Sequence, residues 1–533
     1  METAESTGGL YMRRHLQDGK NLSFFQRYWQ TLLILLIFAV GFALRAYQFG
    51  RLPGGLNPDE ASVGYDAWAI LRYGIDRNGT RLPVHLIAWG SGQNALYAYL
   101  SMPFIALMGL NVYSVRMVNF LMGLLAIPLV FRILDRTAGR RTAFIGMALM
   151  AASPWGIMAS RWGLESNLFP TLFLLTFYVF LVGLDRHKLL PLAAALAALN
   201  LYAYGAAYLV VPVFCLAAIV FMRRGAKIPW RYILISGGVF AAVALPILLF
   251  VLTNIFHWGD IRILCFTAPE MTGVTRMATA TQPHSLLDSM QNFFDNVILQ
   301  RDGTFTNHLP GYGALFPISL PFTFAGCAAL FHMRRRQDGR LFWLLWAWLA
   351  AGLLLFLIYA QTNLNRVNIL YPALILLTAL GLDWLCGSWK RLVSVGACYL
   401  FLLTGFTLTY FGSYRYNIDP LSFVHLGEAI IRADQEAGES QTIYVTSNIN
   451  MPYIYALFYT QTPPDDYLQT VSIPDKEVEF QQVVSFGHFV FNTDGLGQGL
   501  PGIYIVENQV AADCRDYVRI LEVFENYAVL RVD

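Results

Sequence analysis

Long apolar stretches separated by short polar connections fill the chain up to about residue 412. A helix that crosses the hydrocarbon core of a bilayer needs about 20 apolar residues. This pattern predicts a polytopic α-helical membrane protein with about 11 transmembrane helices. The expected spans lie at approximately 29–49, 113–133, 142–160, 168–184, 189–204, 205–222, 231–252, 314–332, 341–360, 367–387 and 392–412.

Clusters of Lys and Arg fall in every second connection between these spans. Because short cytoplasmic loops carry an excess of basic residues, the pattern places the N-terminus in the cytoplasm and the C-terminus outside. The expected location is the cell inner (plasma) membrane, with several passes. The clusters are Arg13/Arg14/Lys20/Arg27, Arg132/Arg136/Arg140/Arg141, Arg186/Lys188, Arg223/Arg224/Lys227/Arg231, Arg334/Arg335/Arg336/Arg340 and Lys390/Arg391.

One apolar segment, residues 94–110, does not fit this alternation. If it crossed the membrane, the basic cluster at 132–141 would lie outside and every later cluster would change sides. We therefore expect an amphipathic helix at the outer interface. The first outer loop then extends from about residue 50 to 112, and a second long outer loop extends from about 253 to 313.

The composition changes after residue 412 to that of a soluble α/β domain. This divides the chain into a transmembrane domain, 1–412, and an extracytoplasmic domain, 413–533. A helix is expected over 421–437, and Asn450-Met-Pro452 is typical of the start of another. Four segments resemble strands: TIYVTS at 442–447, HFVFN at 488–492, GIYIV at 502–506 and YAVLRV at 527–532. We expect this domain to guide substrate or to act as a structural lid.

Composition and charge support this division. Hydrophobic residues make up 56% of the chain and charged residues 13%, against about a quarter charged in soluble domains. Residues 413–533 carry 17 Asp and Glu but 6 Lys and Arg, so the tail is acidic. The 6 cysteines have neither zinc-site nor disulfide spacing. No basic tract with interleaved aromatic residues indicates nucleic-acid binding.

Asp59 and Glu60 follow the first span by a few residues, at the outer water interface. Carboxylates in such a place are suited to proton transfer, because burial and neighbouring charge tune their basicity. The same two acids, directly after Pro58, fit equally well as capping acids at a helix N-terminus.

Other charged residues are expected on the same membrane face. Glu165 lies in a short outer connection, and Arg366 begins a late span. Arg301 and Asp302 lie in the second long outer loop, with His308 nearby. An arginine here either extends its charged end to lipid headgroups or binds a phosphate through two parallel hydrogen bonds. An arginine and a carboxylate base beside the bilayer indicate a lipid-phosphate substrate.

Several short motifs in the first 170 residues resemble those of the GT-C membrane glycosyltransferases. The likeness is to the superfamily of dolichyl-phosphate-mannose protein mannosyltransferases and aminoarabinose transferases, and it covers about residues 30–390. The motifs are Leu44-Arg45-Ala-Tyr47 through Pro53, Asn57-Pro-Asp59-Glu60, Gly64-Tyr65-Asp66-Ala67, Asn94-Ala-Leu-Tyr97-Ala-Tyr99-Leu100, Tyr113-Ser-Val-Arg116, Ala152-Ser153-Pro154-Trp155, and Ser160-Arg161 with Glu165.

This resemblance implies inverting transfer of a sugar from a polyprenyl-phosphate carrier to a hydroxyl acceptor on the outer face. The acceptor would be a cell-envelope glycan, a lipid or a protein. Asp59 would be the general base, Glu60 would orient the sugar or the base, and Glu165 would line the same cavity. Arg366 would bind the carrier phosphate. The expected donor-binding residues also include Arg301, Asp302, Tyr65 and His308.

The second outer loop is too short for the sugar-binding-like domain of the eukaryotic mannosyltransferases, so the resemblance is to a bacterial member. No cofactor is expected. Asp59, Glu60, Glu165 and His85 could form an oxygen-rich site for a divalent metal, but we favour a metal-free enzyme.

Two other classes of function remain open. One is a transporter or flippase of lipid-linked glycans, although transporters bury ionisable residues in mid-span and these charges lie at span ends. The other is a non-catalytic scaffold that uses the acidic tail to bind a partner.

Overall fold

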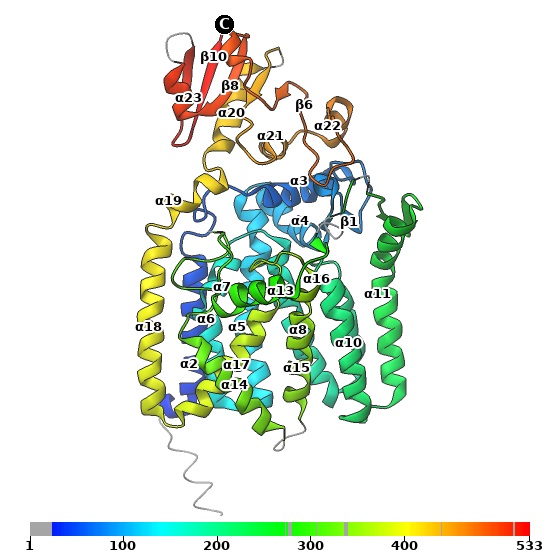
Figure 1. The fold of residues 1–533 in the computed structure, drawn as a ribbon, viewed down its shortest axis with the longest axis vertical. Helices are drawn as coiled ribbons and strands as arrows, with labels where there is room; N and C mark the ends of the chain where they lie inside the picture. Colours follow the sequence, from blue (N-terminus) through cyan, green and yellow to red (C-terminus); the bar gives the residue numbers. More distant parts are fainter. Residues whose placement is uncertain are drawn as a thin grey trace, which may run out of the picture.

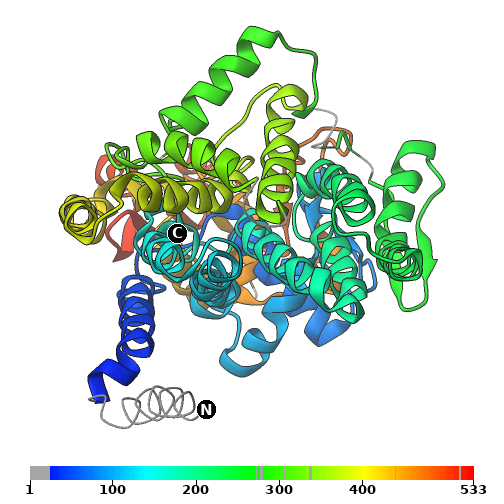
Figure 2. The same ribbon diagram turned by 90° about the horizontal axis from the view of Figure 1, so that it is seen from below.

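A helical bundle and a smaller sheet domain at one of its ends make up the protein (Figure 1). The computed structural model describes residues 24–533 except 272, 276–279, 305, 335–338, 439 and 515–517. The N-terminal basic cluster at residues 13–20 therefore lies outside the described residues. Helices α18 and α11 form opposite edges of the bundle, both in Figure 1 and in the view from below in Figure 2.

Within the described residues, seven helical segments are long and apolar enough to cross a membrane. The chain is therefore a multi-pass membrane protein. These segments are α2 (Phe24–Ala46), α5 (Val112–Thr137), α8 (Glu165–Asp185), α10 (Ala207–Arg224), α11 (Trp230–Phe256), α15 with α16 (Arg340–Leu353 and Leu355–Ile358) and α18 (Trp389–Phe411).

Shorter helices occupy the other predicted spans. They are α6 (Arg140–Ala152), α7 (Pro154–Ala159), α9 (Leu190–Asn200), α14 (Ser319–Met333) and α17 (Leu370–Cys386). The expected span at 142–160 is divided because Ser153 caps a new helix that begins at Pro154. All 11 expected stretches coincide with helices, and the number of membrane crossings stays a prediction.

The segment that did not fit the charge pattern forms α4 (Leu96–Met108), a helix of 13 residues. At 1.5 Å per residue it is about 20 Å long, too short for a hydrocarbon core of about 30 Å. Tyr97 and Ile105 are buried, whereas Leu107 is 84% exposed. The exposed face therefore also carries apolar residues, so α4 differs from the expected helix with one polar face.

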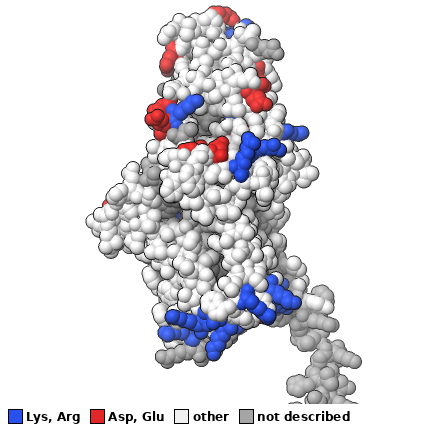
Figure 3. All heavy atoms as spheres, turned by 90° about the vertical axis from the view of Figure 1, so that its right-hand side faces the viewer, with Lys and Arg blue, Asp and Glu red and all other residues white. Residues whose placement is uncertain are grey.

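Ion pairs join three of the connections that were predicted to be cytoplasmic. Asp185 at the end of α8 pairs with both Arg136 of α5 and Arg340 of α15. Arg141 of α6 pairs with Asp383 of α17 at 3.3 Å. These helix ends therefore lie together, and Figure 3 shows Lys and Arg gathered at the end of the bundle away from the sheet domain.

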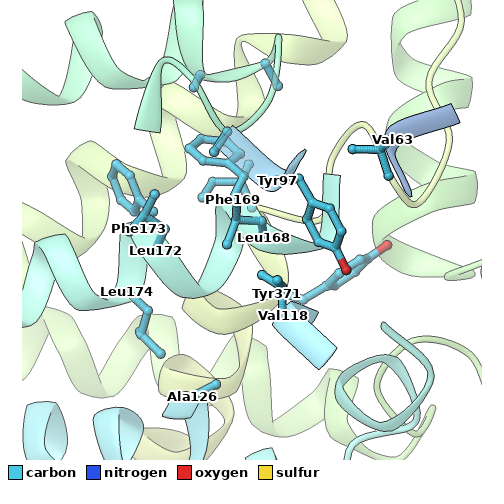
Figure 4. Packing of buried hydrophobic residues seen from close by; sticks show 14 of the residues in the cluster. Val63, Tyr97, Val118, Ala126, Leu168, Phe169, Leu172, Phe173, Leu174 and Tyr371 are labelled. Atoms are coloured by element: carbon cyan, nitrogen blue, oxygen red, sulfur yellow. The ribbon is translucent and has the colours of Figure 1, made fainter. Parts of the chain in front are cut away.

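The first outer loop forms a compact cap over the other end of the bundle. It contains α3 (Pro58–Tyr73), the short strands β1 (His85–Leu86) and β2 (Gln93–Asn94), and the 3-10 turn η2 (Ala88–Gly90) between them. Buried side chains of α4, α5 and α8, including Tyr97, Val118 and Phe169, pack together nearby (Figure 4). The second outer loop contains β3 (Ile261–Ile263), β4 (Phe266–Ala268), α13 (Leu286–Phe293) and η4 (Phe294–Ile298).

A six-stranded sheet with the order β6-β7-β5-β8-β10-β9 forms the C-terminal domain. The four predicted strands correspond to β5 (Ile443–Val445), β7 (Phe489–Val490), β8 (Gly502–Glu507) and β10 (Tyr527–Val532), and β5 runs parallel to both β7 and β8. β6 (Ser485–Phe486) and β9 (Arg519–Val523) complete it. The helices are α19 (Arg415–Ile418), α20 (Leu426–Ala437), α21 (Pro452–Thr460), α22 (Pro464–Thr470) and α23 (Asn508–Asp513).

Candidate active site

The start of α3 places both acids of the Asn-Pro-Asp-Glu motif. The Asn57 side chain accepts a hydrogen bond from the Glu60 backbone N–H at 2.9 Å, and Glu60 accepts one from the Asn57 N–H at 3.2 Å. This reciprocal capping box, with Pro58 in the first turn, fixes where the helix begins. The capping interpretation is therefore correct for Glu60, while Asp59 sits beside it with its side chain half-buried.

Glu60 is fully buried and its carboxylate binds Arg116 of α5. Arg116 donates from Nε to Oε1 at 2.7 Å and from Nη2 to Oε2 at 2.8 Å. The same guanidinium donates to the carbonyls of Pro53 and Gly55, and Glu60 also accepts from the Gly163 N–H. The Glu60–Arg116 pair joins the first outer loop to α5, and the Gly163 N–H joins Glu60 to the second outer connection. Glu60 thus holds the loops in place and does not line the cavity as a sugar-orienting group.

Asp59 faces a polar cavity of ≈ 290 Å³ that is also lined by Glu165 and Arg366. The structure therefore brings together one residue from each of three chain segments that the sequence placed on one membrane face. The walls come from the first and second outer loops, the start of α8, the turn before α10, the end of α11 and the connection after α16. Other lining residues are His85, Gln93, Asn94, Tyr204, Tyr208 and Tyr359.

Arg366 is half-buried and its guanidinium is held at the cavity wall. Nη1 donates to the Gln361 carbonyl at 2.6 Å, and the guanidinium lies 5.7 Å from the centre of the Tyr359 ring. The backbone N–H of Arg366 donates to the Asn363 side chain at 2.8 Å. A local turn and an aromatic face therefore orient a fixed positive charge toward the cavity.

Asp302 and His308 support this turn and are not among the cavity-lining residues, contrary to their expected role in donor binding. The Asp302 carboxylate accepts from the Leu364 N–H at 2.9 Å and from Asn307, which in turn accepts from Asn365. Burial opposes ionisation of Asp302, but hydrogen bonds from His308 and its other donors hold its pKa below the ordinary value. Asp302 is thus an anchor for the segment that carries Arg366.

Arg301 and Tyr65, also expected at the donor site, point elsewhere. Arg301 has a side chain 63% exposed and lies 3.5 Å from Asp295. Tyr65 is six residues after Asp59, which turns its side chain about 240° around α3. Its hydroxyl donates to the Thr462 carbonyl of the C-terminal domain at 2.6 Å.

Sequence reasoning missed the neutral polar and aromatic residues of the cavity. Asn94 donates to the Leu201 carbonyl at 3.2 Å and to the Tyr208 hydroxyl at 3.3 Å, linking the first outer loop to α10. Tyr204 and Tyr359 also line the cavity. Single tyrosines among 28 in the chain carry no spacing signal, so a three-dimensional structure is needed to find them.

The four residues considered as a possible divalent-metal site, Asp59, Glu60, Glu165 and His85, do not form one cluster. Glu60 directs its carboxylate to Arg116, while His85 stacks on Phe250 with ring centres 4.3 Å apart. Within the described part of the chain, no group of three or more His, Cys, Asp or Glu side chains is arranged to hold a metal ion.

The cavity combines an acid able to accept a proton with a cation able to bind a phosphate. The elements that carry them, α3 and the connection after α16, lie toward the end of the bundle that carries the sheet domain (Figure 1). Such an arrangement can hold a phosphorylated lipid and deprotonate a hydroxyl group beside it.

Comparison with known proteins gives a family match for part of the chain and solved structures with a similar fold. Residues 94–250 match the family described as dolichyl-phosphate-mannose-protein mannosyltransferase. The crystal structure of ArnT from Cupriavidus metallidurans bound to undecaprenyl phosphate is 15% identical, with a TM-score of 0.56 over 95% of this chain and 98% of that one. The same values hold for its apo form.

The Archaeoglobus fulgidus oligosaccharyltransferase in its apo form is 11% identical over 91% of this chain and 70% of that one, with a TM-score of 0.49. A search of curated proteins gives no match. The chain thus has the GT-C fold of membrane glycosyltransferases, and its residues 94–250 match the dolichyl-phosphate-mannose-protein mannosyltransferase family.

Proposed function

We propose that this protein is an inverting glycosyltransferase that moves a sugar from a polyprenyl-phosphate carrier to a hydroxyl group. The observation that carries the proposal is that Asp59, Glu165 and Arg366 line one cavity. The ArnT structure with the same fold holds undecaprenyl phosphate, which supports a carrier of this class. The acceptor is a glycan, lipid or protein of the cell envelope.

In the proposed reaction, Asp59 takes the proton of the acceptor hydroxyl as its oxygen attacks the anomeric carbon. The bond between that carbon and the phosphate oxygen breaks on the opposite face, so the anomeric configuration inverts. Arg366 stabilises the negative charge of the departing polyprenyl phosphate. Glu165 binds the sugar or the acceptor, and the cavity wall holds the two reactants in the attacking orientation.

We further propose that the reaction takes place on the outer face of the cell inner (plasma) membrane. The ion pairs that join Arg136, Asp185 and Arg340 bring three basic connections to one end of the bundle. Positive loops favour the cytoplasm, so the cavity and the domain over residues 413–533 would face outward. The proposal includes a cytoplasmic N-terminus and metal-free chemistry.

Mass spectrometry of lipid-linked sugars and envelope glycans tests this function. Cells that lack the protein should accumulate one polyprenyl-phosphate sugar and lose one glycan modification, which identifies donor and acceptor together. Restoring the wild-type chain should reverse both changes, whereas Asp59→Asn should reverse neither. Complementation by Asp59→Asn at normal protein level would refute the assignment of the base.

A further inference from the structure

Trp89 contacts the proposed base directly. Its indole Nε1–H donates to Oδ1 of Asp59 at 3.1 Å. The side chain of Trp89 is 3% exposed, and its backbone has φ of 56°, in the left-handed region that large side chains rarely adopt. Strained backbone of this kind persists where the surrounding structure holds it, and it is concentrated at functional sites.

A buried arginine supports the face of the indole. The Arg77 guanidinium lies 5.0 Å from the centre of a Trp89 ring, and Arg77 is 1% exposed. Arg77 is held in turn by the Ser62 hydroxyl at 2.6 Å and by Asp66 at 3.5 Å. A fixed cation under an aromatic face restricts how the ring can tilt.

Ser62, which binds Arg77, is also connected through Gln93 to the backbone of Asp59. Ser62 donates to Oε1 of Gln93 at 3.1 Å, and Nε2 of Gln93 donates to the Asp59 carbonyl at 3.4 Å. Asp59 is therefore held both at its side chain, by Trp89, and at its carbonyl, by Gln93. Both contacts come from the first outer loop.

The C-terminal domain holds the backbone and the ring edge of Trp89. The Gln481 backbone N–H donates to the Trp89 carbonyl at 3.0 Å. Tyr453 meets the indole edge-on, with ring centres 5.9 Å apart and an interplanar angle of 83°. The Gln481 side chain also packs on Gly90, where an added Cβ would lie 2.3 Å from Nε2. The turn that carries Trp89 thus lies directly beneath the C-terminal domain.

We infer that Trp89 is a positioning residue that orients the Asp59 carboxylate, and that the C-terminal domain holds Trp89 in that position. This inference rests on the proposed function, because it assigns a task only if Asp59 is the base. A hydrogen bond to one carboxylate oxygen limits rotation of the group, and orientation of a base strongly affects proton transfer. The C-terminal domain then contributes to the reaction through its hydrogen bond and ring contact with Trp89.

Fluorine NMR tests the contact without any knowledge of the sugar. The full chain is labelled with 5-fluorotryptophan in lipid nanodiscs, and the Trp89 signal is identified by its loss in Trp89→Phe. Asp59→Leu removes the acceptor, so the Trp89 signal should shift, while the signal of Trp155, which lies in α7 and does not line the cavity, stays in place. An unchanged Trp89 signal in Asp59→Leu would overturn the contact.

Turnover of Trp89→Phe tests the positioning role. Phenylalanine keeps an aromatic ring between Arg77 and Tyr453 but has no N–H, so kcat should fall roughly tenfold or more with the KM for the polyprenyl-phosphate sugar within about twofold. The matched control is Trp155→Phe, because the indole N–H of Trp155 is buried without a hydrogen-bond partner among the described residues. It should retain wild-type kcat. The assay uses the donor that the glycan analysis identifies.

The outcomes separate this inference from the proposed function. If Asp59→Asn is inactive and Trp89→Phe has wild-type kcat, the positioning role is wrong and the proposed base stands. If Asp59→Asn is fully active, the proposed base is wrong whatever Trp89→Phe does. A rise in KM with unchanged kcat in Trp89→Phe would also overturn the positioning role.

A pair of variants at position 481 tests the backbone hydrogen bond from the C-terminal domain to Trp89. Gln481→Ala keeps the backbone N–H that binds Trp89, whereas Gln481→Pro removes it, and both lose the glutamine side chain. Gln481→Pro should lower kcat at least fivefold relative to Gln481→Ala and broaden or shift the Trp89 fluorine signal. Equal kcat and equal Trp89 signals in the two variants would refute the role of the domain.

Tyr453→Leu provides a second test if Gln481→Pro fails to fold. It should shift the Trp89 signal, whereas Tyr444→Leu should not, because Tyr444 stacks on Tyr504 within the sheet domain with ring centres 4.6 Å apart. A Trp89 signal that stays in place in Tyr453→Leu would contradict the proposal that the C-terminal domain holds Trp89.

Discussion

Removal of the Glu60 carboxylate should destabilise the protein far more than removal of an exposed acid. Glu60 accepts hydrogen bonds from Nε and Nη2 of Arg116, from the Gly163 N–H and from the Asn57 N–H. Both charged side chains are completely buried. Glu60→Ala therefore leaves the Arg116 guanidinium buried without its counter-ion.

The expected magnitude follows from this burial. Breaking one side of a buried ion pair costs about 3–5 kcal/mol, because the remaining charge stays desolvated. The matched control is Asp295→Ala, which also removes a carboxylate paired with an arginine. That pair is 3.5 Å long and its Arg301 side chain is 63% exposed, so the loss there should be at most about 1 kcal/mol.

Thermal unfolding of the full chain in nanodiscs, followed by tryptophan fluorescence, provides the comparison. The midpoint for Glu60→Ala should fall several times further than that for Asp295→Ala. Equal midpoints in the two variants would show that the buried pair does not hold the outer loops together. Glu60 would then not be the residue that fixes the positions of Asp59 and Glu165.

Three further predictions concern the anchor of Arg366, a buried acid and a helix contact. Asp302→Ala should raise the Kd for undecaprenyl phosphate several-fold in a binding assay by freeing the segment at 363–366, while Arg301→Ala leaves it within twofold. Burial, with the Asp66 carboxylate nearby, raises the pKa of Asp76 from 3.8 to about 7. The folded state therefore binds this proton more tightly than the unfolded state does. The free energy of unfolding then falls as pH rises from about 4 to 7, by up to about 1.4 kcal/mol per pH unit. Asp76→Asn should flatten the dependence of the unfolding midpoint on pH between 5 and 7, and an unchanged slope would contradict this. Gly326→Ala places a methyl group 1.9 Å from the Leu377 carbonyl oxygen, so it should cost about 1–3 kcal/mol, and an unchanged midpoint would show that α14 and α17 separate easily.

The sequence was sufficient to predict the helices and the strands with continuous patterns. Apolar stretches predicted every long helix, and the largely apolar segment YAVLRV predicted β10, which has the same bounds, Tyr527–Val532. β9 was missed because four of its five residues are exposed, so no run of buried apolar residues marks this strand. The helix expected over 421–437 begins at Leu426, since Phe423 and His425 have positive φ.

The sequence predicted the candidate site only in part. Charge and membrane side placed Asp59, Glu165 and Arg366 on the outer face, and the family resemblance singled them out among the charged residues there. Neither charge nor side distinguishes a group that faces a cavity from one that supports it. Arg301, Asp302, Tyr65 and His308 were therefore assigned to donor binding, whereas the structure directs them to other contacts.

The proposed role of the Asp59 carboxylate is in sugar transfer and not in holding the carrier. The most direct measurement compares purified wild-type protein with Asp59→Asn for two properties, transfer from the polyprenyl-phosphate sugar and binding of undecaprenyl phosphate. We predict that Asp59→Asn lowers kcat by about 100-fold or more and leaves the Kd within threefold, while Arg366→Ala weakens binding. Wild-type turnover in Asp59→Asn would contradict the account, and so would a loss of activity explained entirely by lost binding.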